Sequence, residues 1–234
     1  MGISYSTARY LAPASFIFDF LAQQYGLATN MKTVHDQNLS FWSPQPYFIG
    51  AFFFPQQIIQ LVWLYKLWKR QGTKEELAEM TDYVPIYALG NVCIGTWMFF
   101  WNANELKTSN IFVTINTVAQ VAYVATRLRR MNTSSQTSIL THIVAKTFAG
   151  IGILDLLHNT SSAYFVGEAP STLVKALTGV GFAAAAVTSD WILGSCLVYD
   201  LVALTCGQEG SWRALLGAYA AGAAAIVGVK NWVM

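Results

Sequence analysis

The stretch "YALGNVCIGTWMFFWNANEL", Tyr87–Leu106, decides the class of fold. It is apolar over most of its length, and about 20 such residues suffice for a helix to cross the ~30 Å hydrocarbon core of a bilayer. It also carries Asn91, the tryptophans Trp97 and Trp101, and Glu105 near its end. The stretch therefore predicts a membrane-spanning helix and raises the question of whether its aromatic face lines a binding site.

The composition of the whole chain agrees with a membrane environment. Of 234 residues, 54% are hydrophobic and only 11% are charged, whereas a soluble domain carries about 25% charge. Aromatic residues make up 14%, including eight tryptophans, which is typical of rings at bilayer interfaces or in apolar pockets. The net charge of +2, without a basic cluster interleaved with aromatics, excludes a nucleic-acid partner.

Apolar runs elsewhere in the chain predict an all-α, polytopic integral membrane bundle that forms a single transmembrane domain, residues 1–234. The region 172–206 has almost no polar break, and its simplest interpretation is one long helix from about Gly179 to Cys206. This gives about seven helices, with six or eight as alternatives. The expected spans are about 9–28, 46–68, 84–103, 110–128, 138–158, 179–206 and 212–233.

The distribution of Lys and Arg predicts an orientation, because cytoplasmic loops carry more of these residues. With seven spans, the N-terminus is cytoplasmic and the C-terminus lies on the other side; the sequence does not indicate which organelle. Nine cations then fall on the cytoplasmic side and four on the other. The nine are Arg9, Lys66, Lys69, Arg70, Lys74, Arg127, Arg129, Arg130 and Arg213, and the four are Lys32, Lys107, Lys175 and Lys230.

Two further segments carry predictions about packing. The charged piece "KRQGTKEELAEMTD", residues 69–82, is expected to be a surface connector. Near the end of the chain, Gly217, Ala221 and Ala225 recur every four residues. Such faces let helices approach closely in lipid, so we expect tight packing of the last two helices, with a homodimer interface as the alternative use.

Ionisable residues inside the expected spans form the first group of candidate functional residues. Each costs about 2.5–3.5 kcal/mol at the bilayer centre, so each needs a partner or a purpose. Lys146 is the one deep cation and is expected to pair with Asp190 or Asp19, as a structural clamp or as a polar centre for substrate or protons. The five residues are Asp19, Lys146, Asp155, Asp190 and Asp200.

Motifs for metal or cofactor chemistry are absent from the sequence. Cys93, Cys196 and Cys206 lack the spacing of metal ligands, and no nucleophile motif, phosphate loop or dinucleotide fingerprint appears. Lys230 lies too near the end of the last span for a retinal protein. We therefore predict neither a metal site nor a cofactor.

The aromatic pattern resembles the tryptophan-rich sensory proteins, the family of the translocator protein, and in particular its longer branch. The resemblance rests on "YALGNVCIGTWMFFWNANEL", with its W-x-x-x-W pair, and on "TSNIFVTINTVAQVAYVATRLRR" after it. Upstream, "FWSPQPYFIGAFFFPQQIIQLVWLYKLWK" resembles the proline–aromatic entry into the second helix, with Pro44 and Tyr47 in the pattern P-x-x-Y. Asn91 stands six residues before Trp97 instead of three, and Phe52 fills a tryptophan position of the family.

The resemblance implies an all-helical membrane bundle that binds planar or polycyclic apolar ligands, such as porphyrins and sterols, among its first helices. Helical spacing adds that Trp97 and Trp101 share one face and that Phe48, Phe52, Ile59 and Trp63 form a stripe on the preceding helix. The alternative is an interfacial aromatic belt. The expected ligand-binding residues are Pro44, Tyr47, Phe52, Trp63, Asn91, Trp97 and Trp101.

The leading functional hypothesis is thus a multi-pass protein that binds or transports a porphyrin-, sterol- or isoprenoid-like molecule without catalysing a reaction. Its partners are the lipid bilayer and this ligand. The alternative is an integral-membrane enzyme, for example a terpene cyclase that uses Asp19 with Asp190 or Asp200 as proton donors, although the Trp–Glu pair of such enzymes is missing. A structural subunit is a third possibility, suggested only by the small-residue helices.

Overall fold

The computed structural model describes residues 3–233, and within that range the chain is entirely helical. Eight long helices and one short helix, α2, follow one another with brief connections. The helices are α1 (Tyr5–Ala28), α2 (Met31–Gln37), α3 (Pro46–Lys69), α4 (Lys74–Asn102), α5 (Leu106–Thr126), α6 (Gln136–Tyr164), α7 (Thr172–Thr188), α8 (Trp191–Gly207) and α9 (Gly210–Val233).

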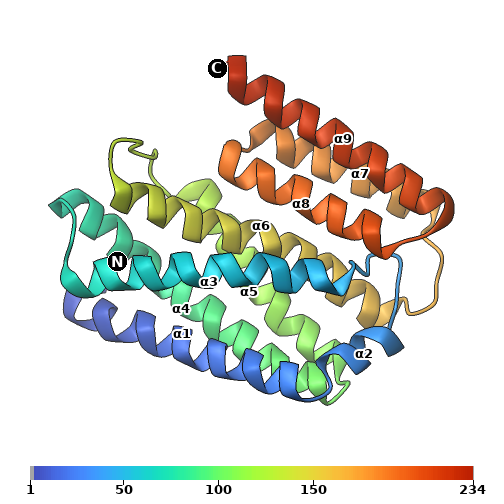
Figure 1. Cartoon of the computed structure of the whole chain (residues 1–234), viewed down its shortest axis with the longest axis horizontal. Coiled ribbons are helices and arrows are strands. Elements are labelled where there is room, and N and C mark those ends of the chain that lie inside the picture. Colours follow the sequence, from blue (N-terminus) through green and yellow to red (C-terminus); the bar gives the residue numbers. More distant parts are fainter. Residues whose placement is uncertain (1–2, 234) are drawn as a thin grey trace.

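The long helices form two packed groups (Figure 1). The first group contains α1, α3, α4, α5 and α6, which lie side by side, and the second contains α7, α8 and α9. Helix α6 joins the groups, because it contacts α3, α4 and α5 on one side and α8 on the other. The short α2 lies at one end of the bundle against α1 and α4. Consecutive long helices run in alternate directions.

The central position of α6 is reflected in the two hydrophobic cores. Val144 and Phe148 of α6 pack in the core shared with α1, α3 and α4. One turn further along, Ile151 and Leu154 pack in the core shared with α7, α8 and α9. The residues of α6 between these cores, Ala149 and Gly150, are therefore buried in the middle of the protein.

The region 172–206 differs from the single long helix that its apolar run predicts. The structure has two helices there, α7 and α8, separated at Ser189 and Asp190, whose backbones are extended. The Asp190 side chain accepts a hydrogen bond from the Leu193 N–H at 3.1 Å and so caps α8. Aspartate is among the best N-cap residues, and this local cap outweighs the continuity of the apolar pattern.

The charged segment 69–82 also differs from the surface connector expected there. Most of it forms the first turns of α4, which begins at Lys74. Thr73 accepts a hydrogen bond from the Glu76 N–H at 3.3 Å, and Glu76 accepts one from the Thr73 N–H at 2.9 Å. This reciprocal capping box satisfies two backbone donors, so the helix starts about ten residues before the apolar stretch.

Four helices are long and apolar enough to cross a membrane: α3, α4, α6 and α9. Helices α7 and α8 are apolar but have 17 residues each, about 25 Å of helix, which is the lower limit for a span. The all-α architecture and its membrane character thus agree with the sequence, whereas the arrangement of seven spans is not confirmed.

The small residues of α9 divide between two faces. Ala220 and Ala223 are buried, in the core shared with α7 and α8. Ala221, Gly222 and Ala225 are exposed on the outside of the bundle. The last two helices therefore pack closely, as expected. The small residues of α9 that pack in this core are Ala220 and Ala223, whereas Ala221 and Ala225 of the predicted repeat face outward.

Candidate functional site

The ionisable side chains of α6 are the starting point for a functional site. His142, Lys146, Asp155 and His158 all lie on this helix, and His142, Lys146 and His158 are buried. Since α6 is covered by helices of both groups, their partners must come from other parts of the chain. The sequence predicts the end of this helix near residue 158, but α6 continues to Tyr164 and keeps His158 inside the bundle.

Lys146 forms an ion pair with Asp190. Its Nζ donates to Asp190 Oδ2, so of the two partners considered from the sequence, Asp190 and Asp19, the structure brings Lys146 to Asp190. The break between α7 and α8 places this carboxylate at the first turn of α8, where its other oxygen binds the Leu193 N–H. The pair therefore ties the middle of α6 to the start of α8.

Three other carboxyl groups, Asp19, Asp155 and Asp200, come from α1, α6 and α8. A negative charge on Asp19 acts electrostatically on Asp155, and a negative charge on Asp155 acts on Asp200. Asp19 Oδ1 accepts a hydrogen bond from Gln23 Nε2 at 3.1 Å. Asp200 is 0% exposed, and within residues 3–233 neither of its oxygens has a hydrogen-bond partner. We call these three residues the carboxyl cluster.

Within residues 3–233, no cation forms an ion pair with the carboxyl cluster. The ion pairs found among the described residues join Lys32 to Asp36, Arg129 to Asp82, His142 to Glu79 and Lys146 to Asp190. None of them includes a member of the cluster. Buried carboxylates ordinarily have a charged partner or several hydrogen bonds, so this arrangement has a structural cost and leaves free acceptor atoms in the interior.

A second buried group lies nearer the beginning of α6. His142 Nε2 is 3.4 Å from Glu79 Oε1 of α4, and Ser138 Oγ donates to Glu79 Oε2 at 3.4 Å. The His142 side chain is 1% exposed, and both its ring nitrogens lack a hydrogen-bond partner in the part of the chain that the structure describes. An imidazole and a carboxylate at this distance need only a small adjustment to exchange a proton.

At the other end of α6, a histidine of this helix pairs with a histidine of α2. His158 Nε2 and His35 Nδ1, from the short helix α2, are 3.2 Å apart, and His158 Nδ1 is 3.3 Å from Ser162 Oγ. The indole of Trp101 lies against His158, with ring centroids 5.4 Å apart. Burial lowers the pKa of His35 below its usual value, so this ring is neutral at pH 7 and can accept a proton.

The two tryptophans of the opening stretch do share one face, as their spacing predicts. Their ring centroids are 5.4 Å apart. Trp97 Nε1 donates to Asn159 Oδ1 at 2.6 Å, and Trp101 Nε1 donates to the Met31 carbonyl at 3.1 Å. Trp101 is only 2% exposed. Residues of α6 and α2 thus fill the space in front of this face.

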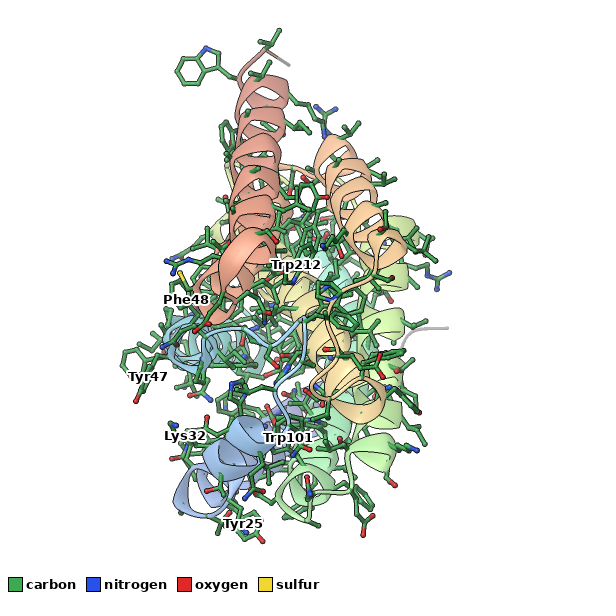
Figure 2. The ribbon with its side chains drawn as sticks, turned by 90° about the vertical axis from the view of Figure 1, so that its right-hand side faces the viewer. Tyr25, Lys32, Tyr47, Phe48, Trp101 and Trp212 are labelled. Atoms are coloured by element: carbon green, nitrogen blue, oxygen red, sulfur yellow. The ribbon has the colours of Figure 1, made fainter. Side chains whose placement is uncertain are left out.

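The expected ligand-binding residues from the preceding helix lie in different places. Tyr47 is 72% exposed and points away from the molecule, whereas Trp101 lies within the bundle (Figure 2). Phe52 packs against Tyr199 of α8, with ring centroids 5.3 Å apart. Pro44 is buried in the connection before α3. These residues therefore do not gather around Trp97 and Trp101.

Trp63 and Asn91 are parts of the buried core. Trp63 Nε1 donates to Thr141 Oγ1 at 3.0 Å, and its ring packs on Tyr87. Asn91 Nδ2 donates to Ser15 Oγ at 3.3 Å and to the Tyr87 carbonyl at 3.1 Å. Both side chains join helices through hydrogen bonds, which is the role that polar groups commonly have between membrane helices.

Two pockets lie elsewhere on the molecule. One of about 440 Å³ lies on α8 and α9 and contains two tryptophans. Another of about 590 Å³ lies at the end of the bundle where α1 and α4 begin. The first is lined by Trp191, Ala225, Gly228, Val229, Trp232 and Val233. The second is lined by Ile3, Tyr5, Arg70, Gly72, Lys74, Leu77, Ala78, Thr81 and Asp82.

The chain matches no protein-family model, no curated protein and no solved structure. The resemblance to the tryptophan-rich sensory proteins therefore stays a prediction from the sequence. Functional argument must start from the residues themselves, and the most unusual of these are the carboxyl cluster and the ionisable groups on either side of it along α6. The apolar sequence around Asp155 and Asp200 marks both as unusual, but their proximity follows only from the packing of α6 against α8.

Proposed function

We propose that the chain is a multi-pass membrane protein that binds and moves a hydrophobic small molecule carrying an amine or hydroxyl group. The carboxyl cluster is the observation that supports this proposal. Each intramembrane carboxyl group has a cost of about 2.5–3.5 kcal/mol, and the ion pairs among residues 3–233 leave all three without a cation. A ligand with a cationic or donor group supplies the missing partner.

The charge of the cluster narrows the class of ligand. A porphyrin with carboxylate side chains would be repelled by Asp19, Asp155 and Asp200. A lipophilic amine, a sterol or an isoprenoid alcohol presents a donor to these oxygens and an apolar body to Leu197, Leu201 and their neighbours. Among the ligands that the sequence suggests, the sterol- and isoprenoid-like classes are therefore favoured over porphyrins.

Binding to the purified protein in detergent tests this assignment. We expect saturable binding of a lipophilic tertiary amine and of a fluorescent sterol, and much weaker binding of protoporphyrin. Asp200→Asn should weaken amine binding at least tenfold, about 1.4 kcal/mol, because a hydrogen bond to a charged group contributes about 1.5–3 kcal/mol. Asp36→Asn, at an exposed site on α2, is the matched control and should bind as the wild type does. Equal binding by wild type and Asp200→Asn would refute the site.

Catalysis by an intramembrane acid is a second candidate, because Asp200 is fully buried and its oxygens are unpartnered among the described residues. Such a carboxyl group is suited to give a proton to a bound olefin. Asp190 is less suited, since it binds Lys146 and caps α8. Product analysis after incubation with an isoprenoid olefin separates the two functions. Conversion that is lost in Asp200→Asn supports the enzyme, and recovery of unchanged substrate supports the carrier.

The alternating directions of the long helices support a proposal for the orientation in the membrane. We infer that all eight long helices cross the bilayer, so that both termini are cytoplasmic. Compared with seven spans, Arg213 and Lys230 exchange sides, and the distribution of nine cations against four stays the same. The positive-inside rule thus fits eight spans as well as seven. Reporters fused to the two termini should both be found on the cytoplasmic side. Reporters found on opposite sides of the membrane would contradict eight spans and support seven.

A further inference from the structure

Ionisable side chains follow α6 from one end to the other. From His142 to His158 the helix rises about 24 Å, most of the ~30 Å hydrocarbon core. His142, Lys146 and His158 each lie next to a titratable side chain from another helix, and Asp155 is within electrostatic range of two. The partners are Glu79 for His142, Asp190 for Lys146, Asp19 and Asp200 for Asp155, and His35 for His158.

We propose that these groups form a path along which protons cross the membrane. The inference rests on the proposed transport function and deepens it, because it names downhill proton movement as the energy source for transport of the ligand. A proton enters at one end of α6, passes between neighbouring side chains and leaves at the other end. Each side chain takes up one proton and releases one, so the protein returns to its starting protonation state.

The first end of the path consists of Glu79 and His142, which are 3.4 Å apart. Histidine is the side chain best suited to relay protons near neutral pH. Both nitrogens of the buried His142 ring lack hydrogen-bond partners within the described chain. The ring is therefore free to take a proton from Glu79 on one nitrogen and release it from the other toward Lys146 and Asp190, one turn further along.

The middle of the path contains a gap. Between Lys146 and Asp155 the helix rises about 13.5 Å, too far for direct transfer, and α6 has the small residues Ala149, Gly150 and Gly152 there. Cys196 of α8 packs closely against Gly150 there, and Thr117 of α5 packs against Gly152. A proton crosses only when water or a ligand bridges the gap, which prevents continuous leakage and makes proton movement depend on occupancy.

The second end of the path is the histidine pair. His158 lies one turn beyond Asp155 and is 3.2 Å from His35, and His35 belongs to α2 at the end of the bundle. The exposed Lys32 and Asp36 flank His35 there. Three tyrosines are also within electrostatic range of these groups: Tyr87 of α4 with Asp19, Tyr199 of α8 with Asp200, and Tyr123 of α5 with Glu79.

Proton flux into liposomes that contain the full-length protein and a trapped pH-sensitive dye tests the path. The inside is made negative with potassium and valinomycin, with and without the tertiary amine. We expect the amine to raise wild-type flux well above that of protein-free liposomes. His142→Gln and Glu79→Gln should each reduce it at least tenfold. Asp82→Asn, a surface substitution on α4, should leave it unchanged.

Because His142 and Glu79 are remote from the carboxyl cluster, both variants should bind the amine as tightly as the wild type. This separates the two proposals. Wild-type flux in both variants, or no flux above protein-free liposomes under either condition, would overturn the proton path and leave ligand binding standing. Flux without any saturable ligand binding would instead overturn the proposed carrier. Retained amine affinity also shows that the variants are folded.

Discussion

Gly207→Ala should destabilise the protein more than any other single methyl group added to a helix. A Cβ at this position would lie 2.4 Å from the Ser43 carbonyl oxygen, 2.5 Å from the Pro44 carbonyl carbon and 2.6 Å from the Gln45 nitrogen. All three are backbone atoms, so no side chain can rotate away. The cost should reach about 3 kcal/mol, the upper part of the range for overpacking, and should lower the thermal midpoint by about 10 °C.

Residues 43–45, opposite Gly207, cannot shift easily, because hydrogen bonds hold them to the end of α8. The Gln45 N–H donates to the Ala203 carbonyl at 3.0 Å, and Gln208 Nε2 donates to the Ser43 carbonyl at 2.8 Å. Gly222→Ala is the matched control, since a Cβ there meets nothing within 4 Å; alanine should leave stability unchanged or raise it by about 0.5–1 kcal/mol. Thermal unfolding in detergent compares the two, and equal midpoints would contradict the close contact.

Lys146→Met should give the second large loss of stability. It removes the cation that balances Asp190 and leaves that carboxylate at the junction of α6 and α8. Removing one partner of a fully buried pair costs about 3–5 kcal/mol. The Asp190 side chain is 36% exposed, so we expect a smaller cost of about 2 kcal/mol.

A double-mutant cycle isolates this interaction. Asp190→Asn keeps an N-cap residue for α8, since asparagine caps as well as aspartate. Lys146→Met combined with Asp190→Asn should therefore be more stable than the sum of the single changes predicts, with a coupling of about 1–3 kcal/mol. Lys32→Met, at the exposed pair with Asp36, should have no measurable effect. Additive losses in the cycle would show that the ion pair does not stabilise the junction.

Apolar runs predicted where long helices lie, but the starts of α4 and α8 differ from the predicted boundaries. Apolar length identified α3, α4, α6 and α9, and the Thr73–Glu76 capping box that starts α4 was readable in the sequence although the charged segment around it suggested a connector. The break at Ser189–Asp190 also has a local cause, the cap of Asp190 on α8. The apolar pattern does not predict this break, because it continues across Ser189 and Asp190.

The sequence predicted which side chains of the candidate site share a face of one helix, but not which side chains of other helices they contact. Spacing placed Trp97 and Trp101 on one face, and their rings do lie together. The hydrogen bonds of their indole N–H groups go to Asn159 and Met31, which lie about 60 and 70 residues away in the chain and which the spacing could not identify. The same limit applied to Lys146, whose two possible partners the sequence could not separate.

The sequence by itself determined that this protein is helical, apolar and suited to a membrane, because hydropathy and helix caps act over a few residues. Only the tertiary structure decided that Lys146 meets Asp190, while no ion pair in the described part of the chain includes Asp19, Asp155 or Asp200. Contacts between ionisable groups depend on which faces of α1, α6 and α8 turn toward one another. That choice is made by the packing of whole helices, which no local pattern records.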